Sequence, residues 1–179
     1  HKYAANRLSD KNQNANIVIE DYRKQEGKFD NIVSIEMFEA VGEKYWKTYF
    51  EKVSTLLKEK GTAIIQTITI KDDLFDEYRC GGDMIRSFIF PGGMLPSQEK
   101  FKNSAEKAGL KIIDKFLFGK DYAATLNMWL NNFDNSIRNI RLLGFDEKFI
   151  RIWRLYLSLC SASFITGRTN VMQVELQHA

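Results

Sequence analysis

The sequence has few residues that hold metal ions, form cross-links or interrupt helices: its 179 residues include two histidines, two cysteines and two prolines. Cys80 and Cys160 cannot build a disulfide framework, which favours a reducing, cytoplasmic setting. The histidines are His1 and His178, so an interior histidine metal site, Ser-His dyad or Cys-His dyad is excluded within this chain. No apolar run approaches the roughly 18 residues that a membrane-spanning helix needs.

The chain also lacks a large excess of either charge, because it has 26 Lys and Arg and 23 Asp and Glu, for a formal net charge of +3. Such a small excess does not favour nucleic acid as a partner. Apolar residues, in contrast, are plentiful: 44% of the chain is hydrophobic and 13% is aromatic. A chain of this length buries roughly 70% of its unfolded surface, so we expect one domain with a substantial core.

Strand and helix patterns alternate along most of the chain. Short runs typical of strands occupy residues 16–20, 29–35, 62–70 and 110–118. Apolar residues at three- and four-residue steps predict a helix over 41–57 that ends before Gly61, and a second helix is expected over 97–108. This alternation is typical of a parallel α/β sheet, and the apolar run 29–35 predicts a strand covered on both faces.

Two stretches depart from that alternation. Residues 72–95 have the composition of an irregular insert, and the chain beyond Tyr122 predicts helices over 125–143 and 146–165, then a strand over 171–177. The second of these helices has one apolar stripe, which belongs either to the core or to the lining of an apolar ligand site. Its members are Phe149, Ile152, Trp153, Tyr156, Leu157 and Cys160.

Polar and aromatic side chains follow three of the expected strands, at the end of a sheet where ligands bind in open α/β folds. Asp21 and Tyr22 follow the first strand, and an acidic group beside an aromatic ring suits a nucleoside. The alternative is an aspartate that caps a turn beside a tyrosine at the rim. Residues 34–39 and 66–68 lie at the other two strand ends.

Glu36 and Glu39 follow the apolar run 29–35 directly, so one of these carboxylates could lie in a partly apolar pocket. Burial would raise its pKa and suit it to proton handling. The alternative is a glutamate in the first turn of the next helix, favoured by the helix dipole. Both cysteines are expected to pack rather than react. The lysines between residues 100 and 120 are expected to form a solvated face, with contact to a membrane surface as the less favoured interpretation.

Five longer motifs are spread along the chain. They are IVSIEMFEAVG at 32–42, QTITI at 66–70, IFPGGMLPS at 89–97, FGKDY at 118–122 and LGFDEKF at 143–149. With the spacing between them, these motifs resemble the signature of the cyclopropane-fatty-acyl-phospholipid synthases and mycolic acid cyclopropane synthases. The similarity covers essentially the whole chain.

The resemblance implies a Rossmann-like class I methyltransferase that uses S-adenosylmethionine. Its members add a methylene group across a cis double bond of an acyl chain in a membrane phospholipid, and a bound bicarbonate ion takes the proton that is lost. The resemblance therefore implies a cytoplasmic protein, peripheral to the inner face of the membrane. A methyltransferase of the same family that acts on a small molecule, such as an amine, is the alternative enzyme.

The family's site residues can be carried over by position. Those that match the bicarbonate site are Ile35, Glu39, Gln66, Ile68 and Tyr122, of which Glu39, Gln66 and Tyr122 are also expected to be catalytic. Those that match the cofactor site are Asp21, Tyr22 and Ser34. Those that match the walls of the acyl site are Phe90, Pro91, Gly92, Trp129, Trp153 and Tyr156. Gln66 stands where some members have histidine, and an amide donates a hydrogen bond without carrying charge.

Two features of the family have no counterpart here. No glycine-rich cofactor loop precedes Asn16, and neither Cys80 nor Cys160 replaces the cysteine of the bicarbonate site. We therefore expect residues 1–179 to be the C-terminal portion of one methyltransferase domain, with an insert at about 72–95 and a helical acyl-site addition at about 123–167. In the family's sheet order the strand 16–20 lies at the far edge, so an apolar edge is expected to stay open. An inactive truncated fragment, or a homo-oligomer formed through that edge, is the alternative to an enzyme.

Overall fold

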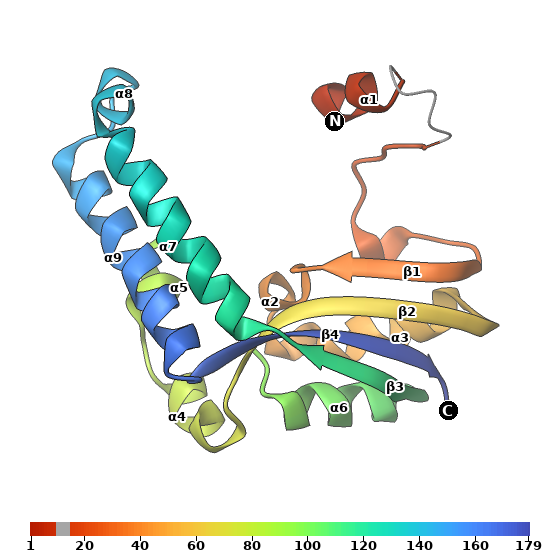
Figure 1. Ribbon diagram of the computed structural model, residues 1–179. Coiled ribbons are helices and arrows are strands. Elements are labelled where there is room, and N and C mark those ends of the chain that lie inside the picture. The colour runs from red at the N-terminus through yellow and green to blue at the C-terminus, as the bar shows by residue number, and fades with distance from the viewer. Residues whose placement is uncertain (10–14) are drawn as a thin grey trace.

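The computed structural model describes residues 1–9 and 15–179, and its described part contains one mixed sheet in the order β1-β2-β4-β3 (Figure 1). The strands are β1 (Phe29–Ile35), β2 (Leu57–Ile70), β3 (Leu110–Leu117) and β4 (Thr169–His178). β1 pairs parallel to β2, and β4 pairs antiparallel to both β2 and β3. Strands β1, β2 and β3 therefore run in one direction, as the α/β pattern predicts, with an antiparallel strand inserted between two of them.

The prediction of a strand over residues 16–20 is wrong. Residues 15–21 form no regular element, and the side chains of Val18 and Ile19 are 60% and 83% exposed. A strand needs a partner for its backbone N–H and C=O groups, and no described strand lies beside this segment. β1 is consequently the edge of the sheet, and Val33 and Ile35 on it are also exposed, so the expectation of a strand covered on both faces is wrong.

One face of the sheet is covered by helices that enclose the main core. They include α2 (Phe38–Val41), α3 (Trp46–Leu56) and α6 (Gln98–Lys107), with short 3₁₀ turns at Tyr22–Lys24 and Glu43–Tyr45 (Figure 1). The fully buried ring of Phe38 contacts the rings of four aromatic residues at centroid distances of 4.9–5.4 Å: Trp46, Tyr49, Phe50 and Phe101. This aromatic cluster fixes the segment that follows β1 against the sheet.

Two helix ends differ in how well the sequence predicts them. Ser97 caps α6 by accepting a hydrogen bond from the Lys100 backbone N–H, and Gly109 follows with φ +75°, as the expected helix over 97–108 requires. In contrast, α3 ends at Leu56 and Gly61 lies within β2. A Cβ at Gly61 would lie 2.8 Å from the Asp30 carbonyl oxygen, so close backbone approach, and not a helix end, requires glycine there.

The segment between β2 and α6 forms a 3₁₀ turn (Asp72–Leu74) and the helices α4 (Phe75–Cys80) and α5 (Met84–Phe88). Cys80 is exposed at the end of α4, so the expectation that it packs is wrong. Cys160 is half-buried, and burial raises the pKa of its thiol to about 11, which leaves the unreactive thiol at neutral pH.

A helical arm rises from one end of the sheet (Figure 1). It consists of α7 (Gly119–Asn135), α8 (Ile137–Leu142) and α9 (Glu147–Ile165), and α7 packs against α9. The helix expected over 125–143 begins six residues earlier and is interrupted at Ser136. A second, smaller core at the foot of the arm joins it to β4 through buried residues: Ala123, Leu126, Leu157, Phe164 and Val171. A separate short helix, α1 (Lys2–Ser9), precedes the sheet.

Gly119 anchors the first turn of α7 to β4, and we expect Gly119→Ala to lower the free energy of unfolding by about 1–3 kcal/mol. The Gly119 N–H donates to Asn170 Oδ1 at 2.8 Å, and a Cβ at residue 119 would lie 2.6 Å from that same oxygen. Urea denaturation measures the loss. Gly82→Ala is the matched control, because nothing lies within 4 Å of its Cβ position. Equal stability of both variants would contradict the packing of α7 on β4.

Candidate functional site

A cavity of about 700 Å³ lies between the α4–α5 segment, the end of β2 and the foot of α9. Most of its wall is apolar, and its apolar lining residues include Ile68, Ile70, Met84, Ile89, Phe90, Leu159 and Phe164. Charged residues also border it, among them Glu36, Glu39, Asp83, Arg86 and Arg168. A mainly apolar cavity with charged groups at its border suits a ligand that has a hydrocarbon part.

Glu39 occupies the first turn of α2, where the buried ring of its neighbour Phe38 holds the backbone against the core. Its Oε1 accepts a hydrogen bond of 2.5 Å from the Ile68 backbone N–H. Its Oε2 is buried, and within residues 1–9 and 15–179 no donor reaches it. Burial raises the pKa of this carboxyl group above its ordinary value. An ionised carboxylate oxygen only accepts hydrogen bonds, so a ligand beside Oε2 must bring a donor.

Tyr122 and Gln66 meet at a second carboxylate, that of Glu36. Gln66 Nε2 lies 2.9 Å from both Glu36 Oε1 and the Tyr122 hydroxyl, which itself donates to Glu36 Oε1. On its other side, Gln66 Oε1 accepts a hydrogen bond from Gln173 Nε2 on β4 at 2.8 Å. The network thus joins four side chains: Glu36 after β1, Gln66 on β2, Gln173 on β4 and Tyr122 on α7. Of these four, Glu36 lines the cavity.

The remaining residues expected at this site lie on either side of the network. Ile68 supplies the N–H that binds Glu39 and also lines the cavity. Ile35 ends β1 and is 53% exposed. The structure therefore brings Gln66, Ile68 and Tyr122 close to the two glutamates, with Ile35 at the solvent side.

Of the three residues expected to bind the cofactor, Tyr22 and Ser34 are linked through Tyr49. The Tyr22 ring lies edge-on to the Tyr49 ring at 5.9 Å, and the Tyr49 hydroxyl donates to Ser34 Oγ at 2.8 Å. Asp21 accepts hydrogen bonds from the Arg23 side chain, which hold the pKa of its carboxyl group well below the ordinary value. Asp21 is therefore ionised at neutral pH, beside a half-buried aromatic ring.

Three of the six residues expected to line an acyl site border the cavity, namely Phe90, Pro91 and Tyr156. Gly92 borders a shallower hollow beside it. Trp129 is 54% exposed on α7 and does not belong to the lining. Trp153 lies one turn above Tyr156 on α9, outside the lining, where it packs on Phe149 and Tyr156.

Two parts of the site were not assigned from the sequence. The first is the partnership of Glu36 with Tyr122, which no residue pattern marks. In the structure Glu36 has a φ of +50°, which is rare for a residue with a side chain. The second is Arg86, which borders the cavity and donates to Asp83 Oδ2 at 2.7 Å and to the Tyr78 carbonyl at 2.7 Å. Asp83 also caps α5, so the pair holds the insert in shape.

Two classes of site have no support in the described part of the chain. No group of three or more His, Cys, Asp or Glu side chains there could hold a metal ion. None of its helices combines the length and the apolar run needed to cross a bilayer.

Known proteins match both the sequence and the fold. The chain is 38% identical over 154 residues to the tuberculostearic acid methyltransferase of Mycobacterium tuberculosis, a match that covers 86% of this chain and 36% of that protein. It is 35% identical over 159 residues to the cyclopropane-fatty-acyl-phospholipid synthase of Escherichia coli, with 88% of this chain and 40% of that protein covered. The chain therefore spans about two fifths of the length of these relatives.

Among solved structures, the mycolic acid cyclopropane synthase CmaA1 complexed with SAH and CTAB superposes with a TM-score of 0.82 at 25% sequence identity. The superposition covers 98% of this chain and 67% of that one. The expected Rossmann-like class I methyltransferase fold is thereby confirmed. The family model described as mycolic acid cyclopropane synthetase matches residues 1–174. The resemblance read from the five motifs is therefore correct, and the chain belongs to the mycolic acid cyclopropane synthetase family.

Proposed function

We propose that this chain provides the acyl-binding and proton-handling part of an S-adenosylmethionine-dependent methyltransferase that forms cyclopropane rings at cis double bonds of phospholipid acyl chains. The observation that carries this proposal is the carboxylate of Glu39, buried at the wall of an apolar cavity with one oxygen free of partners. A hydrocarbon chain would cover the apolar part of the wall, while the free oxygen of Glu39 requires a polar group of a ligand beside it. The relatives named as acting on fatty acids or phospholipids support the same substrate class.

The free oxygen of Glu39 fits a bicarbonate ion, because the hydroxyl of bicarbonate can donate to an acceptor that lacks a donor. Bicarbonate, when bound, supplies a base for the proton that ring closure releases. Glu39 would hold the hydroxyl of that ion, while the Ile68 N–H keeps the other carboxylate oxygen in place. The raised pKa of Glu39 favours a proton shared between the two groups over one lost to solvent.

Glu36, Gln66 and Tyr122 would act beside it as a positioning network. Both Gln66 and the Tyr122 hydroxyl donate hydrogen bonds to Glu36. A change in the charge of Glu36 would therefore alter the strength of both hydrogen bonds. The rings of Tyr156 and Phe90, 6.0 Å apart, face the same cavity and would stabilise positive charge that develops on the acyl chain. These roles assign Glu36, Glu39, Gln66 and Tyr122 a part in stabilising charge or moving a proton.

The cofactor would lie at the other side of β1's carboxyl end, against Asp21, Tyr22 and Ser34. S-adenosylmethionine, when bound, supplies the one-carbon unit as an electrophilic methyl group on sulfur. The ionised Asp21 carboxylate is an acceptor for hydroxyl or amine donors, and the Tyr22 ring offers a face for stacking. The phospholipid substrate would bring the protein to the inner face of the cytoplasmic membrane as a peripheral protein.

Calorimetric titration of S-adenosylhomocysteine into the 179-residue chain tests the cofactor part of this proposal. We expect micromolar binding that Tyr22→Ala weakens more than tenfold, because the Tyr22 ring would contact the adenine. Tyr3→Ala is the matched control, since Tyr3 is 79% exposed on α1. Binding that Tyr22→Ala leaves unchanged would contradict the assigned cofactor site, and no binding would show that this chain alone lacks a working site.

If S-adenosylhomocysteine binds, incubation with S-adenosylmethionine and phospholipids carrying one cis double bond tests the substrate. Mass spectrometry should then show acyl chains heavier by one CH₂ group, with the double bond lost. Methylation of small amines in the absence of lipid product would instead support a small-molecule acceptor.

A further inference from the structure

The far end of the helical arm has the composition of a membrane-binding surface. Here the turn between α8 and α9 exposes three apolar side chains: Leu142 is 79% exposed, Leu143 76% and Phe145 45%. We call these three residues, with the neighbouring cations Arg138, Lys148 and Arg151, the arm tip. Apolar side chains concentrated at the end of a projecting element are unusual for a surface that contacts only water.

The charges around the arm tip are unequal. From Asp134 to Arg154 the chain has five basic and three acidic side chains. Each acidic group is already engaged: Glu147 pairs with Arg141 at 2.7 Å, Asp134 pairs with Arg154 at 2.6 Å, and Asp146 caps α9 at the Phe149 N–H. Over residues 1–9 and 15–179, no carboxylate lies within ion-pairing distance of Arg138, Lys148 or Arg151. Arg151 acts on the Glu147 carboxyl group, whose pKa is lowered mainly by Arg141, without forming a salt bridge with it, so the arm tip presents an excess of positive charge beside exposed leucines.

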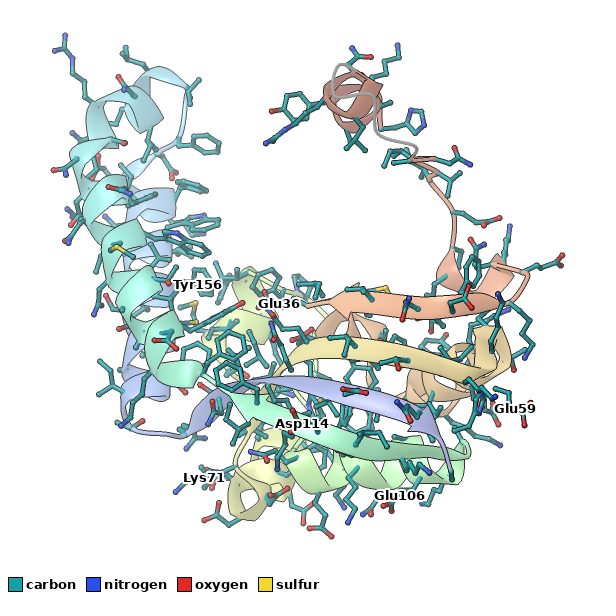
Figure 2. The ribbon with its side chains drawn as sticks, turned by 45° about the vertical axis from the view of Figure 1, so that its right-hand side comes forward. Glu36, Glu59, Lys71, Glu106, Asp114 and Tyr156 are labelled. Carbon is teal, nitrogen blue, oxygen red and sulfur yellow. The ribbon has the colours of Figure 1, made fainter. Side chains whose placement is uncertain are left out.

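A row of aromatic rings connects the arm tip with the cavity. Phe145 stacks on Phe149 at 4.2 Å, Phe149 lies 5.7 Å from Trp153, and Trp153 lies 5.5 Å from Tyr156. Tyr156 in turn contacts Phe90, and both line the cavity. Figure 2 shows Tyr156 on the lower part of the arm, on the side toward Glu36. At about 1.5 Å per helical residue, the row from Phe145 to Tyr156 covers roughly 16 Å.

From the exposed apolar side chains and the excess of positive charge we infer that the arm tip inserts into the surface of a bilayer rich in anionic phospholipids. Leucine and phenylalanine side chains enter the boundary between headgroups and acyl chains, while arginine and lysine contact lipid phosphates. That a phospholipid is also the substrate rests on the proposed function. Binding to a bilayer, however, requires neither cofactor nor turnover, so it is tested independently of that function.

Sedimentation with vesicles of phosphatidylglycerol and phosphatidylethanolamine, both carrying monounsaturated chains, tests the inference. We expect the 179-residue chain to sediment with these vesicles and the double variant L142S/L143S to bind more than tenfold more weakly. Both leucines are far outside the cores, so circular dichroism should show an unchanged fold. V18S/I19S is the matched control, because it removes an equally exposed apolar pair from another part of the chain and should bind as the parent does.

Two further measurements separate insertion from other modes of association. R138Q/K148Q/R151Q should bind the anionic vesicles more than tenfold more weakly, and the parent should bind vesicles of phosphatidylcholine alone only weakly. With brominated acyl chains in the vesicles, the fluorescence of the added tryptophan of L143W should be quenched, whereas that of I19W should not.

Equal binding of L142S/L143S and the parent, or no binding by the parent, would overturn the inference. A variant that changes only the oligomeric state in light scattering would also overturn it, because the arm tip would then contact a second copy of the chain.

Discussion

Glu39→Gln should lower the rate of methylene transfer more than tenfold in the active enzyme while the affinity for S-adenosylhomocysteine stays within about threefold. The substitution keeps the shape of the side chain and the acceptor for the Ile68 N–H, but it removes the negative charge. A neutral amide cannot share a proton as a carboxylate does, so the loss corresponds to at least about 1.4 kcal/mol of transition-state stabilisation. Initial rates on phospholipid vesicles, with S-adenosylhomocysteine titrated separately, measure the two effects.

Glu59→Gln is the matched control, because Glu59 is exposed on β2 at the end of the sheet opposite Glu36 (Figure 2). It should transfer methylene at the parent's rate. Unchanged turnover of Glu39→Gln would contradict the role assigned to Glu39. If turnover and cofactor affinity fell together, the substitution would have disturbed the fold around the site and not the proton transfer.

The stability of the same variant reports on the burial of Glu39. Because the folded-state pKa of this acid is raised, its protonated form contributes stability that is complete below the ordinary pKa of 4.5 and is lost as pH rises through the raised value. Glutamine carries no charge at any pH. The free energy of unfolding of Glu39→Gln, relative to that of the parent, should therefore increase between pH 4 and pH 8.

Phe38→Ala should lower the free energy of unfolding by about 3–5 kcal/mol, the largest loss we expect from a single side chain. The Phe38 ring is fully buried, and its removal leaves a cavity bounded by four other aromatic rings. Because Phe38 directly precedes Glu39, the carboxylate should also lose its fixed position on the Ile68 N–H. Urea denaturation followed by tryptophan fluorescence measures the stability, since Trp46 belongs to the same cluster.

Phe88→Ala removes a ring that is 63% exposed and should change stability by less than about 0.5 kcal/mol. A loss of less than about 1 kcal/mol for Phe38→Ala would mean that the aromatic cluster is not the centre of the core. A loss similar to that of Phe88→Ala would have the same meaning.

The sequence predicts the elements whose signals are local. β1, the later part of β2, β3 and α6 all lie where residue patterns indicate, because their apolar spacing, caps and glycines are contained within the elements themselves. The strand expected over 16–20 fails for the opposite reason. Its sequence is as rich in β-branched residues as that of β1, but a strand forms only beside a partner, and the identity of a partner is not a local property.

The sequence predicts most of the residues of the candidate site, but not how their side chains contact one another. The glutamates at the end of β1 are evident from their position after an apolar strand, and the burial of Glu39 agrees with that expectation. The contact of Tyr122 with Glu36 is not evident, because it depends on how the backbone turns at Glu36 and on where α7 begins. Gln66 takes its position from Gln173, which lies 107 residues away in the chain and has no motif of its own.

The arm tip consists of residues that are close in the sequence, but its exposure depends on the fold. No helix of the arm is both basic and strongly amphipathic when read alone, so the sequence indicates no membrane anchor. The surface arises because α7 and α9 pack together and bring the turn between α8 and α9 to one end of the molecule. Its leucines and cations all lie within residues 138–151, so they are already neighbours in the sequence, and the fold adds their position at the exposed end of the arm.

The position of β4 between β2 and β3 has a consequence for how the protein is made. A ribosome releases β2 and β3 long before it releases β4, yet neither earlier strand pairs with the other in the finished sheet. Until residues 169–178 emerge, one long edge of β2 has no partner, and Gln66 has no Gln173 to orient it. The sheet therefore closes only after synthesis of these strands is complete, through contacts of high sequence separation, which fold slowly. During that interval the unpaired strand edges are open to pairing with other chains.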